Sequence, residues 1–427
     1  MKSTARLSAL VVNYNTGAFA TACVRSLLHE WRRVGRSDDD LEVIVVENAS
    51  PVDQTEHLAA IEALGARVVH AGENLGYAGG MNLAFRHSSG GPDDQVAILN
   101  PDLFFLPGSI GTLMDYVDAH PACGAVDPRA SIDPLGLMQL PRNLLPTLVD
   151  HTRVTLAHMS PRLARMHSRH RMKSTLPYWQ VTGPVESDML SGCCLFLRRS
   201  NVAKVGADLD GQPMDPRYPL YYEDTDLFRR LSAAGLKLIH HGGARILHRW
   251  SRSASAGGEY QEEPMRRYHA SQLVYFERFY GKRGRKYVAW LNEKLAKWPD
   301  EKTLRPMHPL EELGHHEEPL TLPIGRHARY VIEITMSPVF LVTAGMFGEG
   351  DSFTFPRAAW EWLFQGIYLT RAVDLDTGEV LGAWRWGKQS AGRTTPFSIE
   401  ELEALGDAAE RAPDPTVQGE PAGSAAS

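Results

Sequence analysis

The sequence has few cysteines, no long apolar run and no excess of positive charge. Its 427 residues include four cysteines, none of them in a Cys-x-x-Cys pair, so a disulfide scaffold is excluded and we expect reduced thiols. No segment approaches the roughly 18 uninterrupted apolar residues of a membrane span, and the start lacks the apolar stretch and cleavage site of a signal peptide. With 45 basic against 51 acidic residues the net charge is −6, which argues against nucleic-acid binding through bulk charge. We therefore expect a cytoplasmic protein that binds no nucleic acid.

Strand and helix patterns alternate through the first hundred residues. Short β-branched runs at 7–12, 41–46 and 96–99 are typical of buried strands, and apolar residues at helical spacing separate them. The alternation predicts parallel strands with crossover helices, hence an α/β domain whose ligands lie at the carboxyl ends of its strands. Polar clusters follow three strands, and although each could be an ordinary turn, together they favour a shared site. The clusters are Asn13-Tyr14-Asn15, Glu47-Asn48-Ala49-Ser50 and Asn100-Pro101-Asp102.

The character of the chain changes three times after this start. Helical spacing returns at 264–297, and the stretch 299–323 is rich in Pro, His and Glu, which is typical of a linker. The last residues are rich in Ala, Gly, Pro and Ser, a composition that favours disorder. We expect an α/β domain at 1–258, a helical extension at 259–305, a small β-rich accessory domain at 306–400 and a largely disordered tail at 401–427.

The role of the accessory region is not indicated by any motif. Its pattern predicts strands at 330–334 and 339–342 and a hairpin over 369–386. Trp384 and Trp386 fall on one face of the second hairpin strand. Such residues form a core or a stacking platform for sugar rings, and the core is the favoured interpretation.

The segment 151–173 is strongly basic. No acidic residue occurs between Asp150 and Glu186. One interpretation, which we favour, is a solvated helix packed on the domain; the other is a peripheral contact with anionic lipid head groups or with a pyrophosphate-bearing acceptor. An apolar stripe accompanies the basic residues and consists of Leu156, Met159, Leu163 and Met166.

A glycine-rich loop at 74–82 precedes a predicted helix. Glycine permits close backbone approach, and a helix N-terminus suits a phosphate or ribose contact. The loop is not Gly-x-Gly-x-x-Gly, so a dinucleotide site is disfavoured. It also contains no basic residue, which disfavours a nucleotidyltransferase that holds a triphosphate.

Acidic and imidazole side chains supply the candidate chemistry. Asp102 follows a buried strand and could hold Mg²⁺ or Mn²⁺ together with substrate phosphates, or merely cap a turn. Glu223, Asp224 and Asp226 crowd at a helix start, so their mutual repulsion favours a base tuned toward neutral pH. The simpler explanation is that they complement the helix dipole. His248 follows a strand and could be a metal ligand.

The order of these motifs resembles family 2 of the inverting glycosyltransferases, which have the GT-A fold, a Rossmann-like domain that binds a nucleotide-sugar. In detail it resembles the rhamnosyltransferase-like branch that builds bacterial surface polysaccharides. The resemblance covers about residues 5–255. Two residues depart from the pattern, because Glu47 stands where Asp is usual and Asn100 leaves Asp102 as the only acid of its motif. The matching segments are 11–15, 46–50, 74–82, 99–102, 124–129, 142–146, 190–199, 222–227 and His248.

The resemblance implies a role for each matching residue. Asp224 would be the general base on the acceptor hydroxyl, while Asp102 and His248 would ligate a divalent cation, Mg²⁺ or Mn²⁺. Ser191, Gly192 and Glu223 would form the acceptor side. The donor would be bound by Asn13, Glu47, Asn48, Asn74, Gly79, Asn82 and Asn100.

The implied activity is transfer of a sugar with inversion, with dTDP-rhamnose as the favoured donor and a glycan or lipid-linked glycan as acceptor. We expect a cytoplasmic enzyme, and we consider a peripheral position at the inner face of the membrane and a homodimer. The alternatives are a non-catalytic protein that binds a sugar-nucleotide or glycan, and a nucleotidyltransferase.

Overall fold

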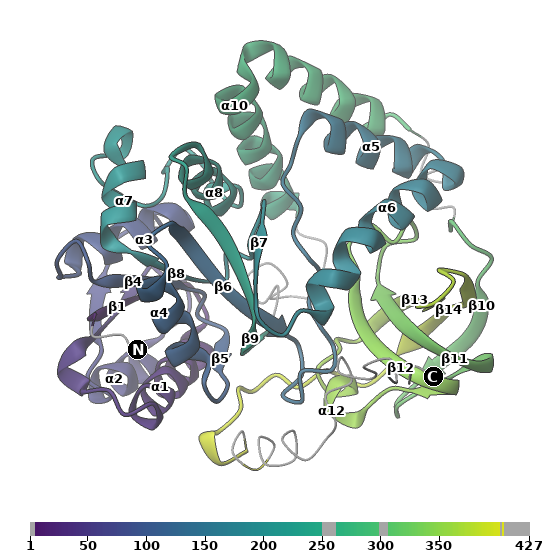
Figure 1. The fold of residues 1–427 in the computed structure, drawn as a ribbon, viewed down its shortest axis with the longest axis horizontal. Helices are drawn as coiled ribbons and strands as arrows, with labels where there is room; N and C mark the ends of the chain where they lie inside the picture. The colour runs from purple at the N-terminus through teal and green to yellow at the C-terminus, as the bar shows by residue number, and fades with distance from the viewer. Residues whose placement is uncertain (1–4, 250–261, 299–305, 402–403, 405–427) are drawn as a thin grey trace, which may run out of the picture.

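The computed structural model describes residues 5–249, 262–298, 306–401 and 404 (Figure 1). The expected boundaries at 258 and 305, and nearly all of the expected tail at 401–427, lie outside these residues, so the division into domains remains a prediction. Within the described part the chain forms two sheets. Three helices lie between them at one end of the molecule: α5 (Leu148–Met159), α6 (Pro161–Gln180) and α10 (Glu262–Ala296).

The first sheet has nine strands among the described residues, in the order β3-β2-β1-β4-β8-β6-β9-β5, with β7 paired to β9. β1 is parallel to β2 and β4, as predicted, whereas β8 runs antiparallel to β4. The sheet is therefore mixed. The strands are β1 (Leu7–Asn13), β2 (Leu41–Glu47), β3 (Arg67–His70), β4 (Gln95–Leu99), β5 (Leu103–Phe105), β6 (Cys123–Ser131), β7 (Pro184–Ser187), β8 (Cys194–Arg198) and β9 (Lys237–His248).

Helices cover both faces of this sheet, which explains why its central strands are apolar throughout rather than alternating. Along β1, Ala9 and Val11 pack into one core cluster, while Leu10 and Val12 pack into the cluster on the opposite face. This confirms the α/β fold class and agrees with the GT-A architecture. The helices are α1 (Gly17–Arg33), α2 (Thr55–Ala63), α3 (Gly76–His87), α4 (Ser109–Ala119), α7 (Arg199–Val205) and α8 (Glu223–Ala233).

The second sheet has five strands among the described residues, in the order β10-β14-β13-β11-β12. Trp384 and Trp386 are both buried in its core, where Trp386 stacks on Trp360 at 5.2 Å between ring centroids. The core interpretation of these tryptophans is therefore correct. The strands are β10 (Glu311–His316), β11 (Thr321–Thr335), β12 (Ala344–Thr354), β13 (Gly366–Asp374) and β14 (Val380–Lys388), with a short helix α12 (Arg357–Trp360).

Two expectations for this region are wrong. The stretch 299–323 is not simply a linker, because β10 and the start of β11 fall inside it. Among the described residues β10 is an edge strand that pairs with β14 alone. Its sequence EELGHH lacks an apolar run because little of it is buried. The segment 339–342 is not a strand; its first three residues are buried beside α5 and α6 instead.

The basic segment forms two helices, α5 (Leu148–Met159) and α6 (Pro161–Gln180), because Ser160 is extended and Pro161 starts a new helix. The buried face of α6 includes Ala164, Met172 and Trp179. The predicted stripe does not make this contact, since Leu156, Leu163 and Met166 are exposed. The helical extension is α10 (Glu262–Ala296), which bends at Gly281.

Candidate active site

The carboxyl ends of β1 and β2 are joined by buried side chains. The Asn13 amide donates a hydrogen bond to Glu47, and Asn13 Oδ1 accepts one from the Thr16 backbone N–H at 3.1 Å. Glu47 Oε1 accepts from the Ser50 N–H at 2.7 Å. Glu47, which is longer than the usual Asp, thus links the end of β1 to the loop that follows β2. The direct partners of both side chains are protein groups, and donor binding by Asn13 and Glu47 remains a prediction.

Asn48 and Asn74 hold the start of α3. Asn48 Oδ1 accepts from the Leu75 N–H at 3.0 Å, and its Nδ2 donates to the Gly76 carbonyl at 3.1 Å and to Asn74 Oδ1 at 3.2 Å. Asn74 Oδ1 also accepts from the Gly76 N–H at 2.9 Å. Gly76 has a φ of 69°, a conformation that favours glycine. The two asparagines therefore shape the edge of the predicted donor loop.

Gly79 and Asn82 lie further along α3. A Cβ on Gly79 would lie 2.8 Å from Leu75 Cβ, so glycine is required there for packing. Asn82 is buried, and its amide both donates to the Met214 carbonyl at 2.8 Å and accepts from the Met214 N–H at 3.0 Å. Asn82 thereby fastens α3 to the segment that leads into α8.

Asn100, Asp102 and His248 come together at the ends of β4 and β9. His248 Nε2 lies 3.4 Å from Asp102 Oδ1 and 3.4 Å from Asn100 Nδ2. Asn100 Oδ1 accepts a hydrogen bond from Tyr77 at 3.1 Å. Burial disfavours the charged ring of His248, but Cys193 and Asp102 outweigh it and raise its pKa well above the ordinary value.

The geometry of this group suits a cation that is shared with a substrate. Asp102 and His248 are both buried, and His248 Nδ1 has no hydrogen-bond partner among the described residues. No group of three or more His, Cys, Asp or Glu that could hold a metal ion is found in the described part of the chain. Mg²⁺ and Mn²⁺ commonly use one or two protein ligands plus substrate phosphates, so the pair fits such an ion.

Glu223 and Asp224 lie at the first turn of α8. The two residues before them, Tyr221 and Tyr222, have φ values of 64° and 70°, a conformation that costs a non-glycine residue on the order of 1–3 kcal/mol. Asp224 Oδ1 accepts hydrogen bonds from the Thr225 N–H at 2.6 Å and hydroxyl at 3.2 Å. The strained turn at Tyr221 and Tyr222 therefore places two adjacent carboxylates at the start of α8.

Their proton affinities are raised by the surroundings. Burial and then the charge of Asp224 raise the pKa of Glu223 to about 8. Burial also raises the pKa of Asp224, against hydrogen bonds from Thr225. Glu223 Oε2 has no partner among the described residues. A carboxylate of this kind can accept a proton from a substrate near neutral pH.

Asp226 has a different environment from its two neighbours. It is fully buried, 2.6 Å from Arg230 and 3.0 Å from Arg278, and it accepts a hydrogen bond from Tyr218. Asp226 is therefore a structural ion-pair residue, and Glu223 and Asp224 remain for chemistry.

The dipeptide Gly192-Cys193 joins the two halves of the site. A Cβ on Gly192 would lie 2.7 Å from Asp224 Cβ, while Cys193 is hydrogen-bonded to His248. The Ser191 N–H donates to Asp127 Oδ2 at 2.7 Å, which anchors this turn. The structure thus brings the candidate base and the candidate metal ligands to either side of one short segment.

Tyr77 and Asp127 fall within the matching segments of the sequence, but no sequence pattern gave either of them a role. Tyr77 is half-buried. Its pKa is raised well above the ordinary value, first by desolvation and then by the charges of Glu223, Asp224 and Asp102. It therefore lies between the carboxylate pair and the metal pair. The only sequence signal for Tyr77 was that it is an aromatic residue within the glycine-rich loop.

Part of the chain is similar in sequence to known proteins. Residues 8–202 match the family described as Glycosyl transferase family 2. The N-acetylglucosaminyl-diphospho-decaprenol L-rhamnosyltransferase of Mycobacterium tuberculosis is 31% identical over 217 residues. That match covers 49% of this chain and 66% of the relative, just under two thirds of its length.

Two solved structures are also similar. The mannosyltransferase PcManGT from Pyrobaculum calidifontis, in complex with GDP-Man and Mn²⁺, has 15% identity and a TM-score of 0.37, and the match covers 69% of this chain and 76% of that one. TarS of S. aureus has 10% identity and a TM-score of 0.41, with 92% and 80% covered.

Proposed function

Because residues 8–202 match the family described as Glycosyl transferase family 2, we propose that this chain belongs to that family and is an inverting, divalent-cation-dependent glycosyltransferase. It would move a sugar from a nucleotide-sugar to an acceptor hydroxyl. The observation that carries the proposal is the Gly192-Cys193 segment, which abuts Asp224 on one side and contacts His248 on the other. A base beside a cation-binding pair is what transfer requires, whereas binding alone does not need the base.

In the proposed reaction Asp224 takes the proton from the acceptor hydroxyl. The acceptor oxygen attacks the anomeric carbon as the bond to the nucleoside diphosphate breaks, and the configuration inverts. The Thr225 N–H and hydroxyl hold Asp224 Oδ1 and so orient the carboxylate. A cation held by Asp102 and His248 would offset the charge of the departing diphosphate.

Rhamnose from dTDP-rhamnose is the proposed donor sugar, and a glycan or lipid-linked glycan is the proposed acceptor. The support is the relative from Mycobacterium tuberculosis, whose name describes an L-rhamnosyltransferase acting on N-acetylglucosaminyl-diphospho-decaprenol. The predicted donor residues on the ends of β1, β2 and α3 would contact the nucleotide.

The test is release of nucleoside diphosphate from a panel of dTDP-, UDP- and GDP-sugars, each with Mg²⁺, with Mn²⁺ and with EDTA. We expect metal-dependent release from one donor. Asp224→Asn should keep donor binding and lose at least 100-fold in turnover, since a general base contributes about 10²–10⁴-fold. The exposed Asp93→Asn is the control. The proposal would be refuted if none of the nucleotides bound in a metal-dependent way.

We further propose that α5 and α6 contact an anionic membrane surface. Leu156, Leu163 and Met166 are 41%, 37% and 67% exposed. Along the sequence they are interspersed with the exposed Arg153, Arg162 and Arg169, and the segment 151–173 has no acidic residue. Apolar side chains between basic ones are typical of interfacial helices. Among the described residues no helix is long and apolar enough to cross a membrane.

Vesicle sedimentation tests this contact. Binding to vesicles that contain phosphatidylglycerol should exceed binding to phosphatidylcholine vesicles, and Leu163→Asn with Met166→Asn should weaken it. The exposed Ile367→Asn, on the second sheet, is the control. Equal binding by all three proteins would contradict the proposal. A homodimer also remains a prediction, to be measured by light scattering.

A further inference from the structure

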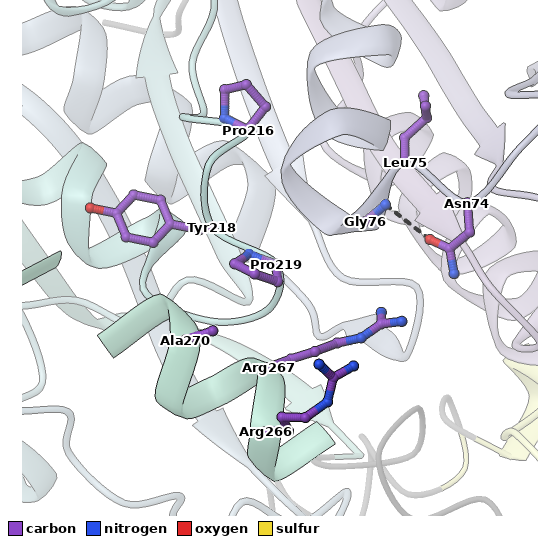
Figure 2. Close-up of a pocket in the computed structure, with 9 residues that line it drawn as sticks. All are labelled: Asn74, Leu75, Gly76, Pro216, Tyr218, Pro219, Arg266, Arg267 and Ala270. Carbon is purple, nitrogen blue, oxygen red and sulfur yellow. Dashed lines mark hydrogen bonds between the residues drawn. The ribbon is translucent and has the colours of Figure 1, made fainter. Parts of the chain in front are cut away.

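A cavity of about 430 Å³ lies between the start of α3, the 216–219 segment and α10. Figure 2 shows the side chains of Arg266 and Arg267 extending from α10 toward the loop that carries Asn74 and Gly76. No sequence motif assigns a function to either arginine.

Arginine supplies the charged side chains that line the cavity. Two of its nine lining residues are arginines and none is Asp or Glu, while Asn74 adds a polar group. Guanidinium groups bind phosphate oxygens through paired hydrogen bonds, which makes arginine the common choice for phosphate recognition. The volume is ample for a diphosphate.

Helix α10, which lines the cavity, is hydrogen-bonded to the turn that precedes the candidate base. Leu220 donates a backbone hydrogen bond to Ser271 of α10 at 3.1 Å, and the hydroxyls of Tyr222 and Tyr268 lie 3.3 Å apart. These contacts hold α10 against the 219–222 turn, which directly precedes Glu223 and Asp224. Asn74, a predicted donor residue, lines one edge of the cavity, but neither Asp102 nor His248 does.

We infer that this cavity binds a second diphosphate, separate from that of the donor and belonging to the acceptor. The inference rests on the proposed function, in which Asp102 and His248 serve the diphosphate of the donor. An acceptor that carries its sugar on a diphosphate would then be anchored by Arg266 and Arg267, with its sugar hydroxyl directed to Asp224.

The test separates the two diphosphates by their need for metal. Binding of inorganic pyrophosphate is measured by calorimetry in EDTA, and binding of nucleoside diphosphate is measured with Mg²⁺. Replacing both arginines, Arg266→Gln with Arg267→Gln, should weaken pyrophosphate binding at least tenfold and change nucleoside diphosphate binding less than twofold. Arg266→Lys with Arg267→Lys should lose less, and the exposed Arg283→Gln, which is also on α10, is the control.

The outcomes are distinct. Unchanged pyrophosphate binding in the double glutamine variant would overturn the inference. An equal loss for both ligands would assign the cavity to the donor and would also overturn it. Because pyrophosphate binding is read without turnover, arginine-dependent binding would support the anion site even if no transfer were detected. Failure of the proposed function is therefore distinguishable from failure of this site.

Discussion

Replacing Glu223 with Gln should remove most of the pH dependence of stability that arises at the start of α8. Burial and the charge of Asp224 raise the pKa of Glu223 from 4.5 to about 8. The folded protein then holds a proton that the unfolded chain releases between these pH values, so stability falls as pH rises from 4.5 to 8. At 1.36 kcal/mol per pKa unit, the full loss is about 5 kcal/mol, of which about 2–3 kcal/mol falls between pH 6 and pH 9.

Urea denaturation at pH 6, 7.5 and 9 measures this difference. Glu223→Gln cannot ionise, so its stability should decline less than that of the wild type by about 2–3 kcal/mol over that interval. The slope with pH is the informative quantity, since the new amide also shifts stability by a pH-independent amount. Glu73→Gln, at an exposed position, should keep the wild-type slope. Parallel curves for wild type and Glu223→Gln would refute the reasoning.

Two further substitutions test the site and the second sheet. Gly192→Ala would put a Cβ 2.7 Å from Asp224 Cβ and 2.8 Å from its Cγ, so the carboxylate must move; nucleoside diphosphate release should fall about 100-fold while nucleotide binding persists. Gly183→Ala, which meets no atom within 4 Å, should retain activity, and equal activities would contradict the prediction. Trp384→Ala removes a buried ring and should cost about 3–5 kcal/mol in thermal or urea unfolding, whereas Trp290→Ala, 50% exposed, should cost little. A folded, stable Trp384→Ala would show that the ring is not part of the core.

The central strands could be predicted because helices bury both of their faces. β1 and β4 need no polar alternation, so their sequences carry a plain apolar run that ends where the site begins. The same logic explains why the polar clusters at these ends could be grouped from the order of residues alone. Parallel strands end at one edge of a sheet, and Asn13 and Glu47 meet there.

The edges of the second sheet could not be predicted in the same way. β10 carries a single apolar residue, Leu313, and pairs with one neighbour only. Its sequence therefore resembles a polar linker. The apolar residues at 339–342 instead predict a strand that the structure does not have, because Val339 and Phe340 pack beside α5 and α6 without belonging to a strand.

The roles of the three acids in α8 depended on contacts that no local pattern contains. Asp226 is neutralised by Arg230, one helical turn away, and by Arg278, which is 52 positions later on α10. Burial raises the pKa of all three acids. Because the two arginines hold Asp226, Glu223 and Asp224 remain as the adjacent pair, in which the charge of Asp224 adds to the rise in the pKa of Glu223. The helix that supplies Arg278 also supplies Arg266 and Arg267 to the neighbouring cavity. α10 would therefore serve catalysis twice in the proposed enzyme, by separating a structural acid from the reactive pair and by anchoring the substrate that the pair deprotonates.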